Sequence, residues 1–393
     1  FKGIASGIAI AREITNIYSN FDTDQKLSFF KEINNRFAPS KNEVEKKITN
    51  YLSNKNDKSL KQLGEAVEGK RQELIRRLNM APNGTPFLVS MREDLIKFLP
   101  INTELKNLDE DIRHLFKSWF NPGFLRLEKI TWETKAAILE KIIKYEKVHQ
   151  IKDMNDLKRR LQQDDRGFFA YFHPILKDEP LIFVEVAFTK GIGKSIQQLI
   201  KPKTDENLNY DTATFYSINN CQDGLMRVTL GNFLIKRVVF EIQQENQKIK
   251  NFGTLSPLPG FADWFFSLNN TKLQDILKKY DISKLEFLKS PQLKVGDPKI
   301  VEEEVALKKL VCHYLINEKI NNKPLNPVSR FHLGNGASIH DVIINGNTSD
   351  YGYSESFGIM VNYGYQLDKL EHIHEDFITK GKISYSDKIK KYV

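Results

Sequence analysis

The chain has 393 residues, of which 40% are hydrophobic and 28% charged, a composition typical of a globular protein long enough for two domains. Its formal net charge is +9, but basic and acidic residues are interspersed, as in KNEVEKK, which argues against nucleic acid as a partner. No apolar run approaches the about 20 residues that a membrane helix needs, so no membrane partner is expected.

The cysteine content indicates a reducing compartment. Cys221 and Cys312 are the two cysteines of the chain, and their wide spacing fits neither a disulfide framework nor a zinc site. A cytoplasmic location is therefore expected. Because the chain begins at Phe1 rather than Met, this expectation leaves open a targeting segment ahead of the first residue.

Residues 1–163 predict helices almost throughout and no strand. Apolar residues recur at helical spacing from residue 4 onward, and Ser40 followed by Glu43 has the pattern of a capping box. Pro-Asn-Gly at 82–84 and Asn-Pro-Gly at 121–123 interrupt the helical pattern. We expect an all-α helical bundle here, with a role in packing or in forming a homo-oligomer.

The composition changes at residues 162–167, and strand patterns follow. Residues 167–172 and 181–188 are rich in aromatic and β-branched side chains, and further strands alternate with helices. Residues 164–393 therefore predict an α/β domain built on a mixed sheet.

The segment 211–264 contains the pattern of a phosphate-binding loop. A strand is expected at 213–218, followed by a loop with Gly224 and Gly231, a helix opening at Asn232, and a second strand at 252–255. A glycine loop that leads into a helix start presents unpaired backbone N–H groups and the positive end of the helix dipole, which suits a phosphate.

Two side chains stand out as candidates for chemistry. Ser256 ends the second expected strand inside SPLPG, although the pattern of this run by itself favours a rigid turn. His332 alternates with Phe331 and Leu333 on what is expected to be a strand, just before a glycine-rich reversal. No metal is expected, since the histidines at 372 and 374 are two positions apart, and side chains at that spacing point away from each other on a helix.

Several runs resemble the malonyl-CoA decarboxylase family. They are GNFLIKRVVFEIQQE and FGTLSPLPGF between residues 231 and 261, RFHLGNGA at 330–337 and GIMVNYGY at 358–365, and the resemblance extends over most of the chain from about residue 88. It implies a helical domain followed by a catalytic domain like the GCN5-related N-acetyltransferases. It also implies decarboxylation of malonyl-CoA to acetyl-CoA and CO2, with the CoA thioester as substrate and no cofactor, in an oligomer.

The resemblance further implies roles for individual residues. Ser256 and His332 match the family's catalytic pair, and Tyr365 matches a tyrosine that lines the same pocket. The CoA pyrophosphate would rest on the loop ahead of the helix, with these candidate binding residues: Gln222, Gly224, Arg227, Thr229, Gly231 and Asn232. Thr229 replaces a residue that is acidic in some relatives, and the run after Ser338 departs from the family pattern.

Two other functions remain open from the sequence. An acyl-CoA-dependent N-acyltransferase would share the CoA site but deliver an amine to the thioester. An inactive CoA-binding protein is suggested by Thr229 and by the altered run after Ser338.

Overall fold

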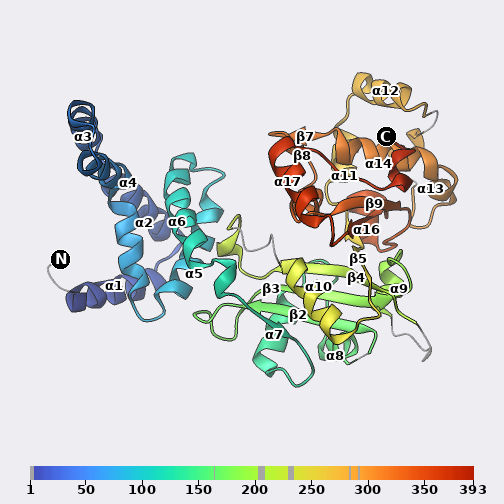
Figure 1. The fold of residues 1–393 in the computed structure, drawn as a ribbon, viewed down its shortest axis with the longest axis horizontal. Helices are drawn as coiled ribbons and strands as arrows, with labels where there is room; N and C mark the ends of the chain where they lie inside the picture. The colour runs from blue at the N-terminus through green and yellow to red at the C-terminus, as the bar shows by residue number, and fades with distance from the viewer. Residues whose placement is uncertain (1–3, 163, 202–208, 229–233, 283–284, 291–292) are drawn as a thin grey trace. The chain divides into compact units, whose positions relative to one another are not determined.

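The computed structural model describes residues 4–162, 164–201, 209–228, 234–282, 285–290 and 293–393 (Figure 1). These form two compact units that interleave along the chain. The helical unit comprises Phe1–Arg126, Phe172–Leu181 and Asn220–Leu230, and the sheet unit comprises Leu127–Tyr171, Ile182–Asn219 and Gly231–Val393. The domain boundary expected between residues 163 and 164 stays a prediction, because it concerns which segment folds independently.

The helical unit is built mainly from α-helices (Figure 1). Its elements are α1 (Ile4–Ser19), α2 (Thr23–Arg36), α3 (Lys41–Asn54), α4 (Asp57–Asn79), α5 (Gly84–Phe98), η1 (Thr103–Leu105), α6 (Lys106–Trp119), η2 (Pro122–Phe124) and η3 (Asp223–Leu225). Ser40 caps α3 by accepting a hydrogen bond from the Glu43 N–H at 3.5 Å. The expected break at 82–84 lies between α4 and α5, and the one at 121–123 follows the end of α6. No described helix in either unit is both apolar enough and long enough to cross a membrane.

The sheet unit contains a mixed sheet with eight strands among the described residues. Its strands are β1 (Arg126–Lys129), β2 (Arg166–Phe172), β3 (Pro180–Thr189), β4 (Thr212–Asn220), β5 (Asn251–Thr254), β6 (Ser256–Pro257), β9 (Ser338–Ile343) and β10 (Met360–Tyr365). The order is β1-β2-β3-β4-β5-β10-β6, and β9 also pairs with β10. A separate hairpin joins β7 (Lys319–Ile320) to β8 (Lys323–Pro324).

Helices connect these strands. They are α7 (Ala136–Tyr145), α8 (Met154–Leu161), α9 (Ile196–Ile200), α10 (Leu234–Glu245), α11 (Phe261–Ser267), α12 (Asn270–Lys279), η4 (Glu286–Lys289), α13 (Pro298–Glu302), α14 (Glu304–Ile316), α15 (Pro327–Gly334), α16 (Asp350–Ser356), α17 (Leu370–Lys380) and α18 (Asp387–Lys390). The strand, helix and strand expected within 211–264 are β4, α10 and β5.

Strand directions confirm the predicted fold class, an N-terminal helical bundle followed by an α/β domain with a mixed sheet. β4 and β5 run parallel, as a crossover through α10 requires, whereas β10 runs antiparallel to β5, β6 and β9. β5 and β6 lie along the same edge of β10, separated by Leu255, whose N–H donates to the Phe215 carbonyl at 2.9 Å. β5 pairs with both β4 and β10, whereas β6, which begins at Ser256, pairs with β10.

One expectation about the first 163 residues is wrong, because they contain the strand β1. Leu125 and Leu127 alternate with charged Arg126 and Glu128, which is the period of a strand, but over too few residues to be recognised beside long helices. Directly after the strand, the Ile130 N–H donates to the Phe168 carbonyl of β2 at 2.8 Å. Pairing with β2 supplies the hydrogen bonds that such a short strand lacks by itself.

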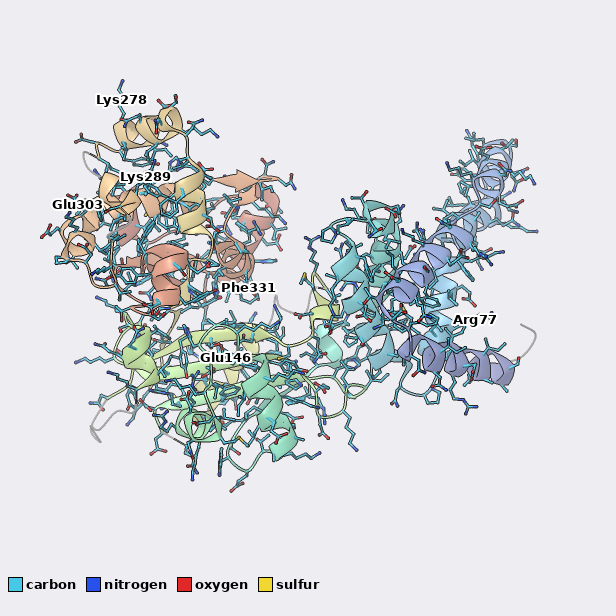
Figure 2. The ribbon with its side chains drawn as sticks, turned by 180° about the vertical axis from the view of Figure 1, so that it is seen from behind. Arg77, Glu146, Lys278, Lys289, Glu303 and Phe331 are labelled. Carbon is cyan, nitrogen blue, oxygen red and sulfur yellow. The ribbon has the colours of Figure 1, made fainter. Side chains whose placement is uncertain are left out.

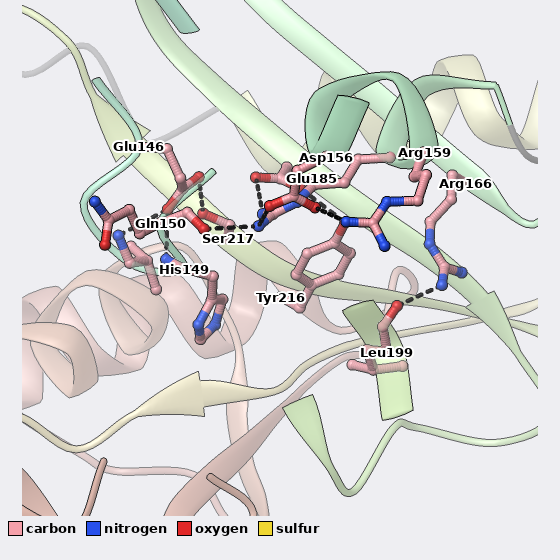
Figure 3. Close-up of polar contacts among 12 residues, drawn as sticks. Glu146, His149, Gln150, Asp156, Arg159, Arg166, Glu185, Leu199, Tyr216 and Ser217 are labelled. Atoms are coloured by element: carbon pink, nitrogen blue, oxygen red, sulfur yellow. Dashed lines mark hydrogen bonds and ion pairs between the residues drawn. The ribbon is translucent and has the colours of Figure 1, made fainter. Parts of the chain in front are cut away.

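A buried polar network fixes the segment between α7 and α8 against β3 and β4 (Figure 3). The Glu146 carboxylate accepts hydrogen bonds from the His149 N–H at 2.6 Å and the Ser217 hydroxyl at 2.7 Å. Glu185 accepts one from the Tyr216 hydroxyl at 2.8 Å and is paired with Arg160 at 3.3 Å. Burial raises the pKa of Glu185, which is fully buried. Arg160 supplies the positive charge that makes this buried carboxyl group tolerable.

Gly224 makes a close approach that no other residue type can make. A Cβ atom there would lie 1.9 Å from the Val89 carbonyl oxygen of α5. We expect Gly224→Ala to lower the free energy of unfolding by about 1–3 kcal/mol or more, since the backbone must shift. Gly64→Ala is the matched control: its Cβ would meet open space within α4, so it should raise that free energy by about 0.5–1 kcal/mol. Urea unfolding measures both, and equal shifts would contradict the packing argument.

Candidate active site

Ser256 lies in a short strand that leads into a turn. Ser256 pairs with Val361 of β10, and Pro257 pairs with Met360. Gly260, at the start of α11, has φ +74°, in the left-handed region that favours glycine. Ser256 and Pro257 therefore belong to the strand β6, and the turn that one interpretation of the sequence expected lies at Pro259 and Gly260. The buried serine hydroxyl is positioned just ahead of this turn.

His332 lies in helix α15, so the expectation that it occupies a strand is wrong. The Asn326 side chain caps the helix by accepting from the Ser329 N–H at 2.9 Å, and Pro327 occupies the first helical position. Alternation over three residues is too short to outweigh a cap followed by proline. The glycine-rich reversal that was expected after it does follow, with Gly336 at φ +81°.

The structure brings together the three residues expected to act in chemistry. The Ser256 Oγ lies 2.9 Å from the His332 Nε2, and the His332 Nδ1 lies 2.8 Å from the Tyr365 hydroxyl. The Ser256 hydroxyl also donates to the Thr254 Oγ1 at 2.8 Å. All four side chains are buried and come from β5, β6, β10 and α15 of the sheet unit.

These contacts set the direction of the hydrogen bonds. Because the Ser256 proton points to Thr254, His332 must donate its Nε2 proton to the Ser256 oxygen. The imidazole is neutral, so Nδ1 accepts from the Tyr365 hydroxyl. Burial lowers the pKa of His332 to about 3 and raises that of Tyr365 well above its usual value, which keeps both groups uncharged. The resting site holds a proton on the His332 Nε2, facing Ser256.

Aromatic rings and one amide fix the imidazole in place. The Tyr363 ring stacks on the His332 ring with centroids 4.6 Å apart, and Phe331, labelled in Figure 2, lies edge-on at 5.1 Å. The Asn326 side chain donates to the Pro259 carbonyl at 2.9 Å, which ties the start of α15 to the turn after Ser256. One buried residue thus both caps the histidine helix and fixes it against the serine turn.

Sequence reasoning missed Thr254, Tyr363 and Asn326. A signal was present for each. Thr254 lies two residues before Ser256, and Tyr363 two before Tyr365, a spacing that places side chains on the same strand face. Asn326 directly precedes a proline, the usual arrangement of a helix cap.

The residues expected to hold the CoA pyrophosphate fall into two groups. Gln222, Gly224 and Arg227 lie in the helical unit, where the Gln222 side chain donates to the Pro180 carbonyl at 3.3 Å and Arg227 is exposed with φ +62°. Thr229, Gly231 and Asn232 lie outside the described residues. A phosphate-binding role for this loop stays a prediction.

Burial of His332 has a consequence for stability that can be measured. Its folded pKa of about 3 lies below its ordinary value of 6.5, so the unfolded chain binds a proton that the folded chain does not. This contribution to stability is complete above pH 6.5 and is lost progressively as pH falls toward 3. Between pH 6.5 and 5, we expect wild type to lose about 2 kcal/mol more unfolding free energy than His332→Asn does. Urea unfolding at both pH values measures it, and parallel losses would refute it.

Sequence and structure comparisons identify relatives along the whole chain. A family model described as the malonyl-CoA decarboxylase N-terminal domain matches residues 37–120, and one described as the C-terminal domain of the same enzyme matches residues 123–393. The mitochondrial malonyl-CoA decarboxylase of the goose Anser anser anser is 34% identical over 346 residues, covering 81% of this chain and 68% of the goose protein.

Solved structures extend the similarity to the fold. The crystal structure of malonyl-CoA decarboxylase from Rhodopseudomonas palustris matches with a TM-score of 0.91 and 40% identity, over 100% of this chain and 96% of that one. The enzyme from Agrobacterium vitis matches with a TM-score of 0.89 at 40% identity over the same shares. The sequence resemblance to this family is thereby confirmed.

Proposed function

The chain belongs to the malonyl-CoA decarboxylase family, and on this basis we propose that it converts malonyl-CoA to acetyl-CoA and CO2 with Ser256 and His332 as its catalytic pair. The observation that carries the proposal is a pair of buried hydrogen bonds in the sheet unit, one between Tyr365 and His332 and the other between His332 and Ser256. It offers a proton on a nitrogen beside a hydroxyl donor, which is what this reaction requires.

The reaction places two demands on the protein. The bond between the α-carbon and the carboxylate breaks, CO2 leaves, and the electron pair is delocalised into the thioester carbonyl as an enolate. The α-carbon must then receive a proton. A donor aimed at the developing oxyanion is worth roughly 3 kcal/mol, and a positioned acid contributes about a hundred- to ten-thousand-fold.

His332 is suited to deliver that proton. In the free protein its imidazole is neutral, since burial lowers its pKa to about 3. The free carboxylate of bound malonyl-CoA is a negative charge that raises the pKa of a nearby imidazole, so substrate binding favours the imidazolium. His332 then gives its Nε2 proton to the α-carbon and regains one from solvent. One proton is consumed in each turnover.

Ser256 and Tyr365 have supporting roles. With the Ser256 hydroxyl 2.9 Å from Nε2, it is placed to hydrogen-bond the departing carboxylate or the thioester oxygen while His332 acts. Tyr365 orients the imidazole through Nδ1: its hydroxyl donates to the neutral ring and accepts from the protonated ring. Its raised pKa keeps the phenol uncharged at neutral pH. Self-association through the helical domain and a cytoplasmic site of action remain predictions.

Mass spectrometry of the products from malonyl-CoA tests the activity. Wild type without any amine acceptor should release acetyl-CoA and CO2, and Ser256→Ala should do so about a hundredfold more slowly, since it lacks a hydroxyl donor. Turnover only in the presence of an amine would instead identify an N-acyltransferase. Tight CoA binding without turnover would identify an inactive CoA-binding protein, and either result would overturn the proposal.

Tyr365→Phe tests the orienting role separately. Loss of one hydrogen bond of about 0.5–1.5 kcal/mol should lower kcat roughly 3- to 10-fold and leave KM unchanged. Tyr363→Phe is the matched control, because it keeps the ring stacked on His332 and removes a hydroxyl that makes no hydrogen bond to the imidazole. Steady-state kinetics should show a loss in the first variant alone, and equal losses would assign Tyr365 a packing role.

A further inference from the structure

The helical unit contains a pocket of about 370 Å3 that the proposed chemistry does not use. Its walls come from the second half of α5, the turn at 99–106, α6 and residues 226–227. The charged side chains that line it are four basic and two acidic: Arg92, Lys106, Arg113, Arg227, Asp109 and Glu110. Two positive charges are therefore in excess.

One of the two carboxylates that line the pocket is already paired. The Arg92 Nε donates to the Asp109 carboxylate at 2.8 Å, and its Nη1 donates to the Gly224 carbonyl at 2.6 Å. This pair is buried, since the Arg92 side chain is 1% exposed. Asp109 therefore neutralises Arg92 and is not available to the other cations. Glu110 alone remains to offset Lys106, Arg113 and Arg227.

The arginines lie close enough to act on one another. Burial lowers the pKa of Arg92, Asp109 raises it, and the charges of Arg113 and Arg227 lower it further. Like charges held together without a ligand repel, and a bound anion relieves that repulsion. The pocket thus has the electrostatics of an anion site.

Arg113 has a buried N–H without a partner in the described part of the chain, and Arg227 has an unusual backbone conformation. The Arg113 Nε is buried, and among the described residues no hydrogen-bond partner lies within its reach. Buried polar groups normally have a hydrogen-bond partner, so a buried guanidinium N–H at a pocket wall is placed to donate to an acceptor on a ligand. Arg227 is exposed at φ +62°, a strained conformation for a residue other than glycine, and such strain gathers at functional sites.

Apart from Thr103, the remaining lining of the pocket is apolar. It comprises Ile96, Leu99, Pro100 and Met226, and the Met226 side chain is half exposed. An apolar wall beside guanidinium groups fits a ligand that joins a charged group to a flat ring. The volume is within the range of small-molecule sites.

We propose that this pocket binds a phosphorylated nucleoside, with the phosphate on Arg113 and Arg227 and the base against the apolar wall. A phosphate monoester carries close to two negative charges at neutral pH, which matches the excess of two positive ones. Guanidinium groups bind phosphate through paired N–H donors. The ligand is either a free nucleotide or the nucleotide end of CoA, and the second source rests on the proposed function.

Calorimetry on the full chain tests the binding. Adenosine 3′,5′-bisphosphate should bind saturably, and adenosine at least roughly 10-fold more weakly, since a charge-assisted bidentate contact is lost. Arg113→Gln should weaken the bisphosphate to a similar extent. Lys117→Gln, an exposed position on the same helix and outside the pocket, should not.

The exposed Arg227→Gln is a second variant in case Arg113→Gln fails to fold, and the same weakening is expected from it. The proposed nucleotide binding is refuted if wild type shows no saturable binding, or if the Lys117 variant weakens binding as much as the pocket variants do. Because calorimetry needs no turnover, this result does not depend on the proposed reaction.

Kinetics distinguishes the two sources. If the nucleotide end of CoA occupies the pocket, Arg113→Gln raises KM for malonyl-CoA about 10-fold and leaves KM for malonyl-pantetheine unchanged. If a free nucleotide occupies it, both KM values are unchanged while bisphosphate binding is weakened. Either outcome supports the pocket and identifies its ligand.

Discussion

His332→Asn is expected to lower kcat for malonyl-CoA decarboxylation by about a hundred- to ten-thousand-fold, the contribution of a positioned general acid. The asparagine amide can still face Ser256, but it cannot carry a proton to carbon. KM should change little, because the imidazole is buried among Ser256, Tyr363 and Tyr365 in a site that other groups shape. Product formation from malonyl-CoA at saturating substrate measures the effect.

A matched histidine elsewhere in the sheet unit serves as the control. His372→Asn changes a side chain on α17 that is 75% exposed, so activity should stay within about twofold of wild type. A His332→Asn protein that folds normally and keeps a tenth or more of wild-type kcat would contradict the assigned role.

Arg160→Met is expected to lower the free energy of unfolding by about 3–5 kcal/mol, because it removes the cation that faces a fully buried carboxyl group. Arg160 also donates to the Gln150 carbonyl at 3.0 Å, and this hydrogen bond is lost as well. Figure 3 shows this network. Thermal and urea unfolding with circular dichroism measure the loss.

The neighbouring Arg159→Met is the control for Arg160→Met. The Arg159 side chain is 56% exposed, and Asp156 keeps its contact with Arg160 when Arg159 is replaced, so the loss should cost about 0–1 kcal/mol. The pH dependence gives a further check. Burial already raises the pKa of Glu185, and a carboxyl group with a raised pKa destabilises the fold as pH rises. The deficit of Arg160→Met should therefore shrink on acidification, and a deficit independent of pH would indicate lost packing alone.

Local sequence patterns predicted the elements that are long or strongly patterned. Examples are the aromatic and β-branched runs of β2, β3 and β4 and the amphipathic run of α10. Their patterns are long enough to indicate a strand or a helix from the local sequence alone. Prolines on either side of Leu258 favoured a turn, and a turn is present at Pro259 and Gly260. The residue types suited to proton transfer, serine and histidine, were also visible.

Short elements were decided by their partners. β1 exists because β2 supplies its hydrogen bonds, as the bond from Ile130 to Phe168 shows. Around His332 the apolar alternation was misleading, since Asn326 and Pro327 start a helix there, and helix formation is set by its cap rather than by three residues.

By itself the sequence determined the fold class, the family and the chemical identity of the candidate catalytic groups. Only the tertiary structure decided that Ser256 and His332, 76 positions apart, meet at 2.9 Å and that Tyr365 completes the set. Such contacts come from strand pairing and burial between distant segments, which local propensity does not encode. The same holds for Gly224, whose lack of a side chain permits contact with Val89, a fact that becomes visible only once the two segments are packed together.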